Sequence, residues 1–280
     1  MSLLDAFVEA SLREDIKDGD HTSLACIEAG KRDSARLIIK DEGVIAGIDF
    51  AEFVFKKLDP DCTFTRILKD GDDVKYGDIA FEVTSYARTL LKAERLVLNT
   101  MQRLSGVSTM SRKFARLLED LPVTVLDTRK TTPLMRFLEK WAVRIGGCSN
   151  YRDGLYDWIM IKDNHVDAAG GVGNAIKKVK HYLQLHNKTL GITVEVRNLE
   201  ELNQVMAEGG ITRIMLDNFE LETLREAVEI IGDQFESEAS GGVNYDTIRA
   251  IAETGVDFIS VGALTHSAGS LDMSLKIIRD

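Results

Sequence analysis

Cysteine is scarce in this chain of 280 residues. The three cysteines, Cys26, Cys62 and Cys148, are odd in number and far apart, so they predict neither a disulfide framework nor a zinc knuckle. Isolated thiols are typical of a reducing compartment, and we expect a cytoplasmic protein.

Long hydrophobic runs are also missing. No apolar run approaches the roughly 18 residues that a membrane-spanning helix requires, so we expect no membrane partner. The opening stretch MSLLDAFVEASLREDI lacks a basic start and a small-residue cleavage site. It predicts an acidic amphipathic helix rather than a signal peptide.

Positive charge is in deficit, with a formal net charge of −10. This excess of acid argues against a nucleic-acid partner, because such binding depends on neutralising phosphates with Lys and Arg. It does not exclude small anionic substrates, since a local cationic pocket can oppose the global field. No HExxH motif, Ser/His/Asp order or Cys/His pair is present, which disfavours zinc and nucleophilic chemistry.

Hydrophobic content of 44% and charged content of 29% are ordinary for a globular protein, and the length suits two domains. We place the first domain at residues 1–110. It is predicted to hold an opening helix, short strands around 34–47, a helix at 49–58 and a hairpin at 64–83. A helix from about 88 to 120 follows, and Ser105-Gly106 is its expected hinge.

From Val123 onward, strand and helix patterns alternate every 20–35 residues, which is typical of repeated βα units. Residues 111–269 are therefore predicted to form an α/β barrel, and a C-terminal helix at about 270–280 is expected to pack with the first domain. The strand-like patches are VTVLDTRK, WIMIKDNH, ITVEV, RIMLDN, FESEASGG and DFISVGALTHS, with a seventh, less regular one around GGCSNYR.

Charged or small residues follow each patch. Because the carboxyl ends of parallel barrel strands open into one mouth, these side chains are expected to converge on one pocket, which favours an enzyme. They are Asp127, Arg129, Lys130, Arg152, Lys162, Glu195, Asp217, Ser240 and His266.

The cations of this set indicate an anionic substrate. Arg129 suits bidentate capture of a carboxylate and Lys130 suits a phosphate, although the same loop could be merely solvated. Arg95, Arg152 and Lys162 extend the positive charge. Glu195 and Asp217 end neighbouring strands and could share Mg²⁺, or could instead pair with the nearby cations.

Small residues in the last two units favour a phosphate site. Ser240-Gly241-Gly242 and Gly262-Ala263 each lie between a strand and a helical segment, where backbone N–H groups can approach a phosphate. Turns without any ligand remain the alternative.

The chain resembles the quinolinate phosphoribosyltransferase family. DTRKTTP, NYRDGL, IKDNH, VEV, LDN, EASGG and SVGALTHS carry the resemblance in order, and EDIKDGDHTS and AERLVLNTMQRLSG extend it towards the N-terminus. It implies an N-terminal open α/β sandwich domain and an incomplete, seven-stranded α/β barrel in a homodimer with shared active sites, with higher assembly left open. It also implies the reaction of quinolinate with phosphoribosyl pyrophosphate to give nicotinate mononucleotide, pyrophosphate and CO2.

Site roles follow from the same resemblance. It implies that Arg129, Arg152 and Lys162 hold the quinolinate carboxylates, beside Tyr151, and that Arg95 reaches the partner's site. It further implies that Lys130 and Lys162 face phosphates. Glu195 and Asp217 would bind Mg²⁺ and the ribose hydroxyls. The 5′-phosphate site would be lined by Ser240, Gly241, Gly262 and His266.

Four positions depart from the family pattern. Tyr151 stands where histidine is usual, Leu134 and Cys148 stand at glycine positions, and Ala239 replaces serine. Tyrosine can donate a hydrogen bond but stays neutral, so we expect activity to be retained. Leu134 opens a helix after Pro133, where we expect no positive φ.

Three other functions remain open: a related phosphoribosyltransferase acting on another acid, a Schiff-base aldolase with Lys162 as nucleophile, and a non-catalytic binding protein. The presence of both Glu195 and Asp217 favours an enzyme over the last.

Overall fold

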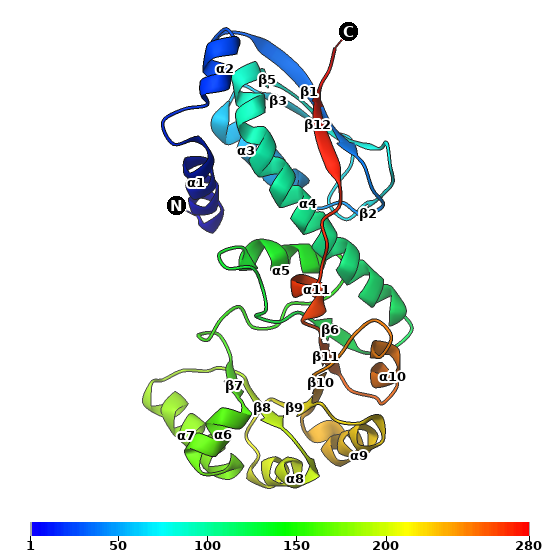
Figure 1. The fold of residues 1–280 in the computed structure, drawn as a ribbon. Helices are drawn as coiled ribbons and strands as arrows, with labels where there is room; N and C mark the ends of the chain where they lie inside the picture. The colour runs from blue at the N-terminus through cyan, green and yellow to red at the C-terminus, as the bar shows by residue number, and fades with distance from the viewer. Residues whose placement is uncertain (1, 280) are drawn as a thin grey trace. The chain divides into compact units, whose positions relative to one another are not determined.

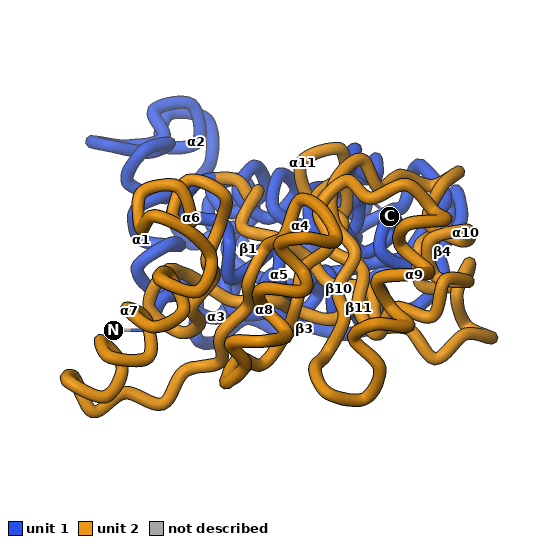
Figure 2. The backbone as a smooth tube through the Cα atoms, turned by 90° about the horizontal axis from the view of Figure 1, so that it is seen from below, with its two compact units in different colours: residues 1–112, 133–147, 268–280 blue, residues 113–132, 148–267 orange. Residues whose placement is uncertain are grey.

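A computed structural model describes residues 2–279. The chain forms two compact units, coloured separately in Figure 2. The first comprises Met1–Arg112, Pro133–Gly147 and Ala268–Asp280, and the second comprises Lys113–Thr132 and Cys148–Ser267. Each unit is therefore assembled from segments that are far apart in the sequence.

The first unit is built on a four-stranded antiparallel sheet of order β12-β1-β5-β3 (Figure 1). Its strands are β1 (Arg32–Ile39), β3 (Thr63–Arg66), β5 (Ile79–Tyr86) and β12 (Met273–Ile277). Alternate β1 residues Ala35, Leu37 and Ile39 are fully buried, as expected when one face of a sheet covers a core.

Helices and a small second sheet complete this unit. A capping box joins Ser2 and Asp5 at the start of the first helix, which satisfies backbone donors there. The pair β2 (Gly43–Val44) and β4 (Asp73–Val74) is antiparallel. The helices are α1 (Leu3–Ile16), α2 (His21–Cys26), α3 (Ile48–Leu58), α5 (Arg136–Ile145) and the part of α4 (Ala87–Leu117) up to Arg112.

The C-terminal helix predicted at 270–280 is wrong, because this segment contains strand β12. Met273 and Leu275 are buried, whereas Ser274 and Lys276, which follow them, are more exposed. This two-residue alternation suits a strand. β12 pairs with β1 and places Leu275 opposite Leu37, so the segment does join the first unit's sheet.

The hinge expected at Ser105-Gly106 is also wrong, since α4 runs without a break from Ala87 to Leu117. Gly106 serves close packing instead. A Cβ there would lie 1.9 Å from the carbonyl oxygen of Gly269, so only glycine lets that backbone approach the helix.

Leu134 contradicts the expectation that no positive φ occurs after Pro133. Its φ is +64° and its side chain is 89% exposed. The turn after Pro133 therefore has the left-handed conformation that disfavours any residue with a Cβ.

The second unit holds a six-stranded parallel sheet of order β6-β11-β10-β9-β8-β7, which confirms the predicted α/β class. At the seventh patch the structure has a single parallel bridge, Leu126 to Ser149. The strands are β6 (Thr124–Leu126), β7 (Ile159–Ile161), β8 (Ile192–Val196), β9 (Arg213–Asp217), β10 (Glu236–Ser240) and β11 (Phe258–Ser260).

Helices alternate with these strands (Figure 1). Val194, Val196, Ile214 and Ile259 are fully buried in the sheet, as parallel strands covered on both faces require. The helical segments are α6 (Asp163–Ala169), α7 (Val172–Leu185), α8 (Leu199–Glu208), α9 (Leu221–Ile231), η1 (Gly232–Gln234), α10 (Ile248–Ala252) and α11 (Ala263–His266).

Asp127 secures the irregular segment at the seventh patch. Its carboxylate is fully buried and accepts hydrogen bonds from Asn150 Nδ2 at 2.6 Å and from Tyr151 N at 2.9 Å. Asp127 therefore fixes the backbone that carries Tyr151 and Arg152. It does not line the cavity described below.

Candidate active site

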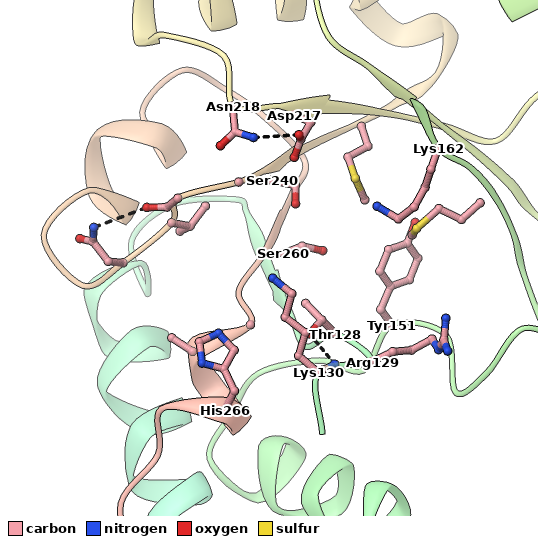
Figure 3. Close-up of a pocket in the computed structure, with 18 of the residues that line it drawn as sticks. Thr128, Arg129, Lys130, Tyr151, Lys162, Asp217, Asn218, Ser240, Ser260 and His266 are labelled. Carbon is pink, nitrogen blue, oxygen red and sulfur yellow. Dashed lines mark hydrogen bonds between the residues drawn. The ribbon is translucent and has the colours of Figure 1, made fainter. Parts of the chain in front are cut away.

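The carboxyl ends of the strands in the second unit surround one cavity of about 770 Å³ (Figure 3). Every lining residue belongs to this unit. They are Thr128, Arg129, Lys130, Tyr151, Arg152, Met160, Lys162, Met215, Asp217, Asn218, Ser240, Gly241, Gly242, Val243, Asn244, Ser260, Gly262, Ala263, His266 and Ser267.

Most of the predicted site residues lie in this lining, and three do not: Asp127, whose buried carboxylate is described above, Glu195 and Arg95. Glu195 is buried behind Lys162. Arg95 lies on α4 in the first unit, exposed, beside Glu14, Asp15 and Arg103 in a separate hollow. The geometry thus brings ten predicted residues together: Arg129, Lys130, Tyr151, Arg152, Lys162, Asp217, Ser240, Gly241, Gly262 and His266.

Arg129 and Arg152 make one wall cationic. Burial, and then the charge of Arg129, lower the pKa of the Arg152 guanidinium. Two like charges in a partly desolvated wall repel each other. An anion bound between them would relieve that repulsion, which suits a substrate with more than one carboxylate.

Lys162 pairs with Glu195 through a short contact between Nζ and Oε2. The structure therefore shows Glu195 paired with a nearby cation, as the alternative to a metal-binding role predicted. Asp217 lies close by, at the end of the adjacent strand β9. Burial, and then the nearby Glu195 carboxylate, raise the pKa of Asp217. Lys162 and the two acids form a mixed-charge cluster at the ends of adjacent strands β7, β8 and β9.

This acidic pair by itself offers few ligands to a metal ion. Within residues 2–279, no group of three or more His, Cys, Asp or Glu could hold a metal. Mg²⁺ commonly takes one or two carboxylates and completes its shell with water and substrate phosphate oxygens. Glu195 and Asp217 therefore fit Mg²⁺ that arrives with a phosphorylated substrate.

Small residues and two basic side chains form the opposite wall. A Cβ on Gly262 would lie 3.0 Å from the His266 ring and 3.1 Å from Lys130 Cδ. Thr265 Oγ1 donates to the Lys130 carbonyl at 2.9 Å. Gly262 thus lets both basic side chains approach, and the Ser240–Gly242 loop adds backbone of the kind that receives a phosphate.

Tyr151 lines the cavity with its ring, while its hydroxyl is engaged elsewhere. The hydroxyl lies 2.6 Å from Oγ1 of the fully buried Thr193. The Arg213 guanidinium stands 5.1 Å from the ring centroid. Burial raises the pKa of Tyr151, so this side chain is a neutral and fixed part of the cavity surface.

The sequence interpretation missed several lining residues. Asn218, Thr128 and Ser260 are polar, and Met160 and Met215 are apolar. Thr128 and Asn218 directly follow strand-like runs already recognised, so the same rule about strand ends would have identified them. The two methionines gave no such signal, because an inward-facing strand residue looks like any other core residue.

Two family models cover almost the whole chain. The quinolinate phosphoribosyl transferase N-terminal domain matches residues 20–105, and the C-terminal domain matches residues 107–276. An α/β fold with cations and small-residue loops around one cavity defines an enzyme class that handles anionic, phosphorylated substrates.

Similar proteins narrow that class. The decarboxylating quinolinate phosphoribosyltransferase 1b of Nicotiana tabacum is 42% identical, over 98% of this chain and 82% of its own length. A probable nicotinate-nucleotide pyrophosphorylase of Bacillus subtilis is also 42% identical, over 94% of this chain and 90% of its own. The chain belongs to the quinolinate phosphoribosyltransferase family.

Solved structures agree with this assignment. NadC from Streptococcus pyogenes superposes with a TM-score of 0.92 at 37% identity, covering 99% of this chain and 97% of the other. The nicotinate-nucleotide pyrophosphorylase from Francisella tularensis gives 0.90 at 39% identity, with 99% and 96% covered. The family resemblance and the fold class drawn from the sequence are confirmed. Within residues 2–279, no helix is long and apolar enough to span a bilayer.

Proposed function

We propose that this protein transfers the phosphoribosyl group of phosphoribosyl pyrophosphate to quinolinate in NAD biosynthesis. The products are nicotinate mononucleotide, pyrophosphate and CO2. The observation that carries the proposal is a single cavity with two different walls. Arg129 and Arg152 lie on one, and the Ser240–Gly242 and Gly262–His266 segments lie on the other. Arg129, Ser240 and His266 are labelled in Figure 3.

The arginine wall suits quinolinate. Its two carboxylates match the guanidinium groups of Arg129 and Arg152, which can each bind a carboxylate through two hydrogen bonds. Lys162, which directly follows β7, adds a third cation. Arg95 of the partner subunit completes this set in the proposal, because it lies exposed on α4 and outside its own chain's cavity.

The opposite wall suits the phosphoribosyl donor. Ser240, Gly241, Gly262 and His266 would receive the 5′-phosphate, and Lys130 and Lys162 would face the pyrophosphate. Asp217 and Glu195 would take the ribose hydroxyls and Mg²⁺. When bound, Mg²⁺ would neutralise the charge of the pyrophosphate.

Held between the walls, the pyridine nitrogen would attack the ribose carbon as pyrophosphate departs. Fixing both reactants in this geometry removes most of the entropic cost of bringing them together for the reaction. Transfer makes the nitrogen positively charged, and that charge stabilises the electron pair left on the ring carbon when the neighbouring carboxylate departs as CO2. A proton from water then binds to that carbon and gives nicotinate mononucleotide. Arg129 and Arg152 hold the ring during both steps.

A homodimer with shared sites and a cytoplasmic location are further parts of the proposal. The exposed position of Arg95 supports the first. The second is supported by Cys26, Cys62 and Cys148, which form no disulfide within residues 2–279, as expected in a reducing compartment.

A Schiff-base aldolase is less well supported. A Schiff-base lysine needs its amine free to attack a carbonyl, but Lys162 Nζ is held in an ion pair with the buried Glu195. Sodium borohydride with a carbonyl substrate should therefore leave no adduct on Lys162. A trapped adduct would revive this alternative.

The direct test is an assay of the purified chain with quinolinate, phosphoribosyl pyrophosphate and Mg²⁺. We expect nicotinate mononucleotide and CO2 in equal amounts, measured by chromatography and by release of labelled carbon. Nicotinate and other pyridine acids are run in parallel. Faster turnover of one of these would assign the chain to a different acid.

Metal removal provides the next prediction. Excess EDTA should abolish turnover, and added Mg²⁺ should restore it, because Glu195 and Asp217 add negative charge beside the pyrophosphate and a divalent cation would offset it. Full activity in EDTA would show that the lysines alone serve the leaving group.

A further inference from the structure

Asn218 connects two parts of the cavity. In the proposed function, one of them, Asp217, binds the ribose hydroxyls, and the other, the Ser240–Gly242 loop, binds the 5′-phosphate. It follows β9 directly and lines the cavity between Asp217 and the Ser240–Gly242 loop (Figure 3). Its backbone has φ of +56°, a left-handed conformation that asparagine tolerates better than most residues.

The side-chain amide of Asn218 holds the Asp217 carboxylate. Nδ2 donates to Asp217 Oδ2 at 2.8 Å (Figure 3). The hydrogen bond restricts the rotation of a carboxylate that otherwise ends a strand at the cavity edge. A charge-assisted bond of this kind is stronger than one between neutral groups.

The same side chain packs against the Ser240–Gly242 loop. The Asn218 backbone N–H donates to the Ser240 carbonyl at 2.9 Å. Gly241 has φ of +88°, and a Cβ on it would lie 2.3 Å from Asn218 Oδ1 and 2.4 Å from Cγ. The loop therefore lies directly against the amide, and glycine is what allows this contact.

We propose that Asn218 is a positioning residue that sets the spacing between the Asp217 carboxylate and the Ser240–Gly242 loop. It thereby matches the site to the distance between the hydroxyls and the phosphate of a ribose 5-phosphate group. The inference rests on the proposed function, which assigns the hydroxyls to Asp217 and the phosphate to the loop.

Two substitutions separate the amide from the backbone conformation. Asn218→Gly keeps the left-handed backbone and removes both contacts. Asn218→Asp keeps the shape but places a like charge beside Asp217. Asn187→Gly is the matched control, because Asn187 is exposed, also has a positive φ of +49° and lies after α7, outside the cavity.

Calorimetric binding of ribose 5-phosphate is the main measurement, because this probe carries both the hydroxyls and the phosphate but no pyrophosphate leaving group. We expect its Kd to rise about tenfold in Asn218→Gly and about a hundredfold in Asn218→Asp. Quinolinate affinity should stay within about threefold, since Arg129 and Arg152 are untouched. In turnover, kcat/KM for the phosphoribosyl donor should fall while KM for quinolinate holds.

A double-mutant cycle tests the packing contact itself. In the native background, Gly241→Ala suffers both an unfavourable φ and a collision with Asn218. In the Asn218→Gly background only the φ remains, so the loss of ribose 5-phosphate affinity caused by Gly241→Ala should be about tenfold smaller.

Three results would overturn the inference: native affinity for ribose 5-phosphate in Asn218→Gly, an additive cycle, or equal weakening of both ligands with a lowered Tm. The native chain is assayed for nicotinate mononucleotide first. If it makes none but the cycle is still non-additive, the proposed function fails and the positioning role stands. If it turns over normally and the cycle is additive, only the positioning role fails.

Discussion

Tyr151 illustrates how one side chain is defined by what surrounds it. Its hydroxyl faces Thr193 Oγ1, which also accepts a hydrogen bond from Trp158 Nε1 at 2.8 Å. The ring is flanked by Arg213 and Trp158. The side of Tyr151 that meets a ligand is therefore the ring, and the polar tip serves the interior of the unit.

Substitutions at this position should separate the two functions. Tyr151→Phe should keep kcat/KM for quinolinate within about twofold and lower the free energy of unfolding by about 1 kcal/mol, the typical value of one hydrogen bond. Tyr151→His should change kcat/KM by no more than about tenfold, or 1.4 kcal/mol. Steady-state kinetics and urea unfolding provide both values.

Alanine substitutions of the two cavity arginines show how large a loss of kcat/KM should be when a substrate contact is removed. Arg129→Ala and Arg152→Ala should each lower kcat/KM for quinolinate by about 100-fold or more, because each strands a carboxylate without its charge-assisted bonds. A Tyr151→Phe loss as large as theirs would mean that the hydroxyl turns towards the substrate.

Leu134 provides a stability prediction. Leu134→Gly should raise the free energy of unfolding by up to about 1.5 kcal/mol. Relief of left-handed strain gives about 1–2 kcal/mol, and the flexibility of glycine subtracts about 0.5–1. Leu134→Ala keeps a Cβ and should give no gain. Equal gains in both variants, measured by urea unfolding, would attribute the effect to the exposed leucine side chain instead of the backbone.

At the scale of secondary-structure elements, the hydrophobic periodicity of a segment and the strand with which it pairs must be considered together. The last strand, β12, alternates buried and more exposed residues, yet it was predicted as a helix because a short apolar segment after a helix-rich region is ambiguous. Pairing with β1 resolves the ambiguity by supplying backbone hydrogen bonds and by burying Met273 and Leu275.

Within α4, Gly106 should reverse a general rule. Alanine is normally better than glycine in a helix interior by about 1 kcal/mol. Here Gly106→Ala should lower the free energy of unfolding by about 1–3 kcal/mol, because the Cβ collides with the Gly269 backbone and overpacking costs that much.

Gly30→Ala is the control for that variant. A Cβ on Gly30 would have no neighbour within 4 Å, and its stability should change by less than about 1 kcal/mol. If Gly106→Ala were stabilising in thermal unfolding, the helix and the Gly269 segment would not be in contact in solution.

At the scale of the whole molecule, the proposal requires two subunits for each site. Arg95→Ala and Arg152→Ala chains should each be nearly inactive alone. After subunit exchange, a one-to-one mixture should recover about a quarter of native activity. Half of the dimers then combine the two chains, and each of these has one of its two sites intact.

Exchange itself is verified with two affinity tags on the two chains. No recovery in tag-verified mixed dimers would place Arg95 in its own subunit's site. A mixture of Arg129→Ala and Arg152→Ala is the negative control, because both residues line the same cavity of one chain.

The sequence by itself determined most of the local elements, the α/β class, the family and most of the cavity lining. Strand ends such as those at Asp217 and Ser240 could be located because a short run that ends in a charged or small residue is a pattern among near neighbours. The residue types at those ends then indicated an anionic substrate, since Arg and Lys carry their charge in any fold.

Only the tertiary structure decided which of these groups face the cavity and which face each other. It paired Lys162 with Glu195 and turned the Tyr151 hydroxyl towards Thr193. It gave Leu134 a positive φ, and it packed Asn218 against Gly241. Each outcome depends on a turn geometry or on residues from separate strands that meet when the sheet forms, and no pattern among near neighbours encodes such a meeting.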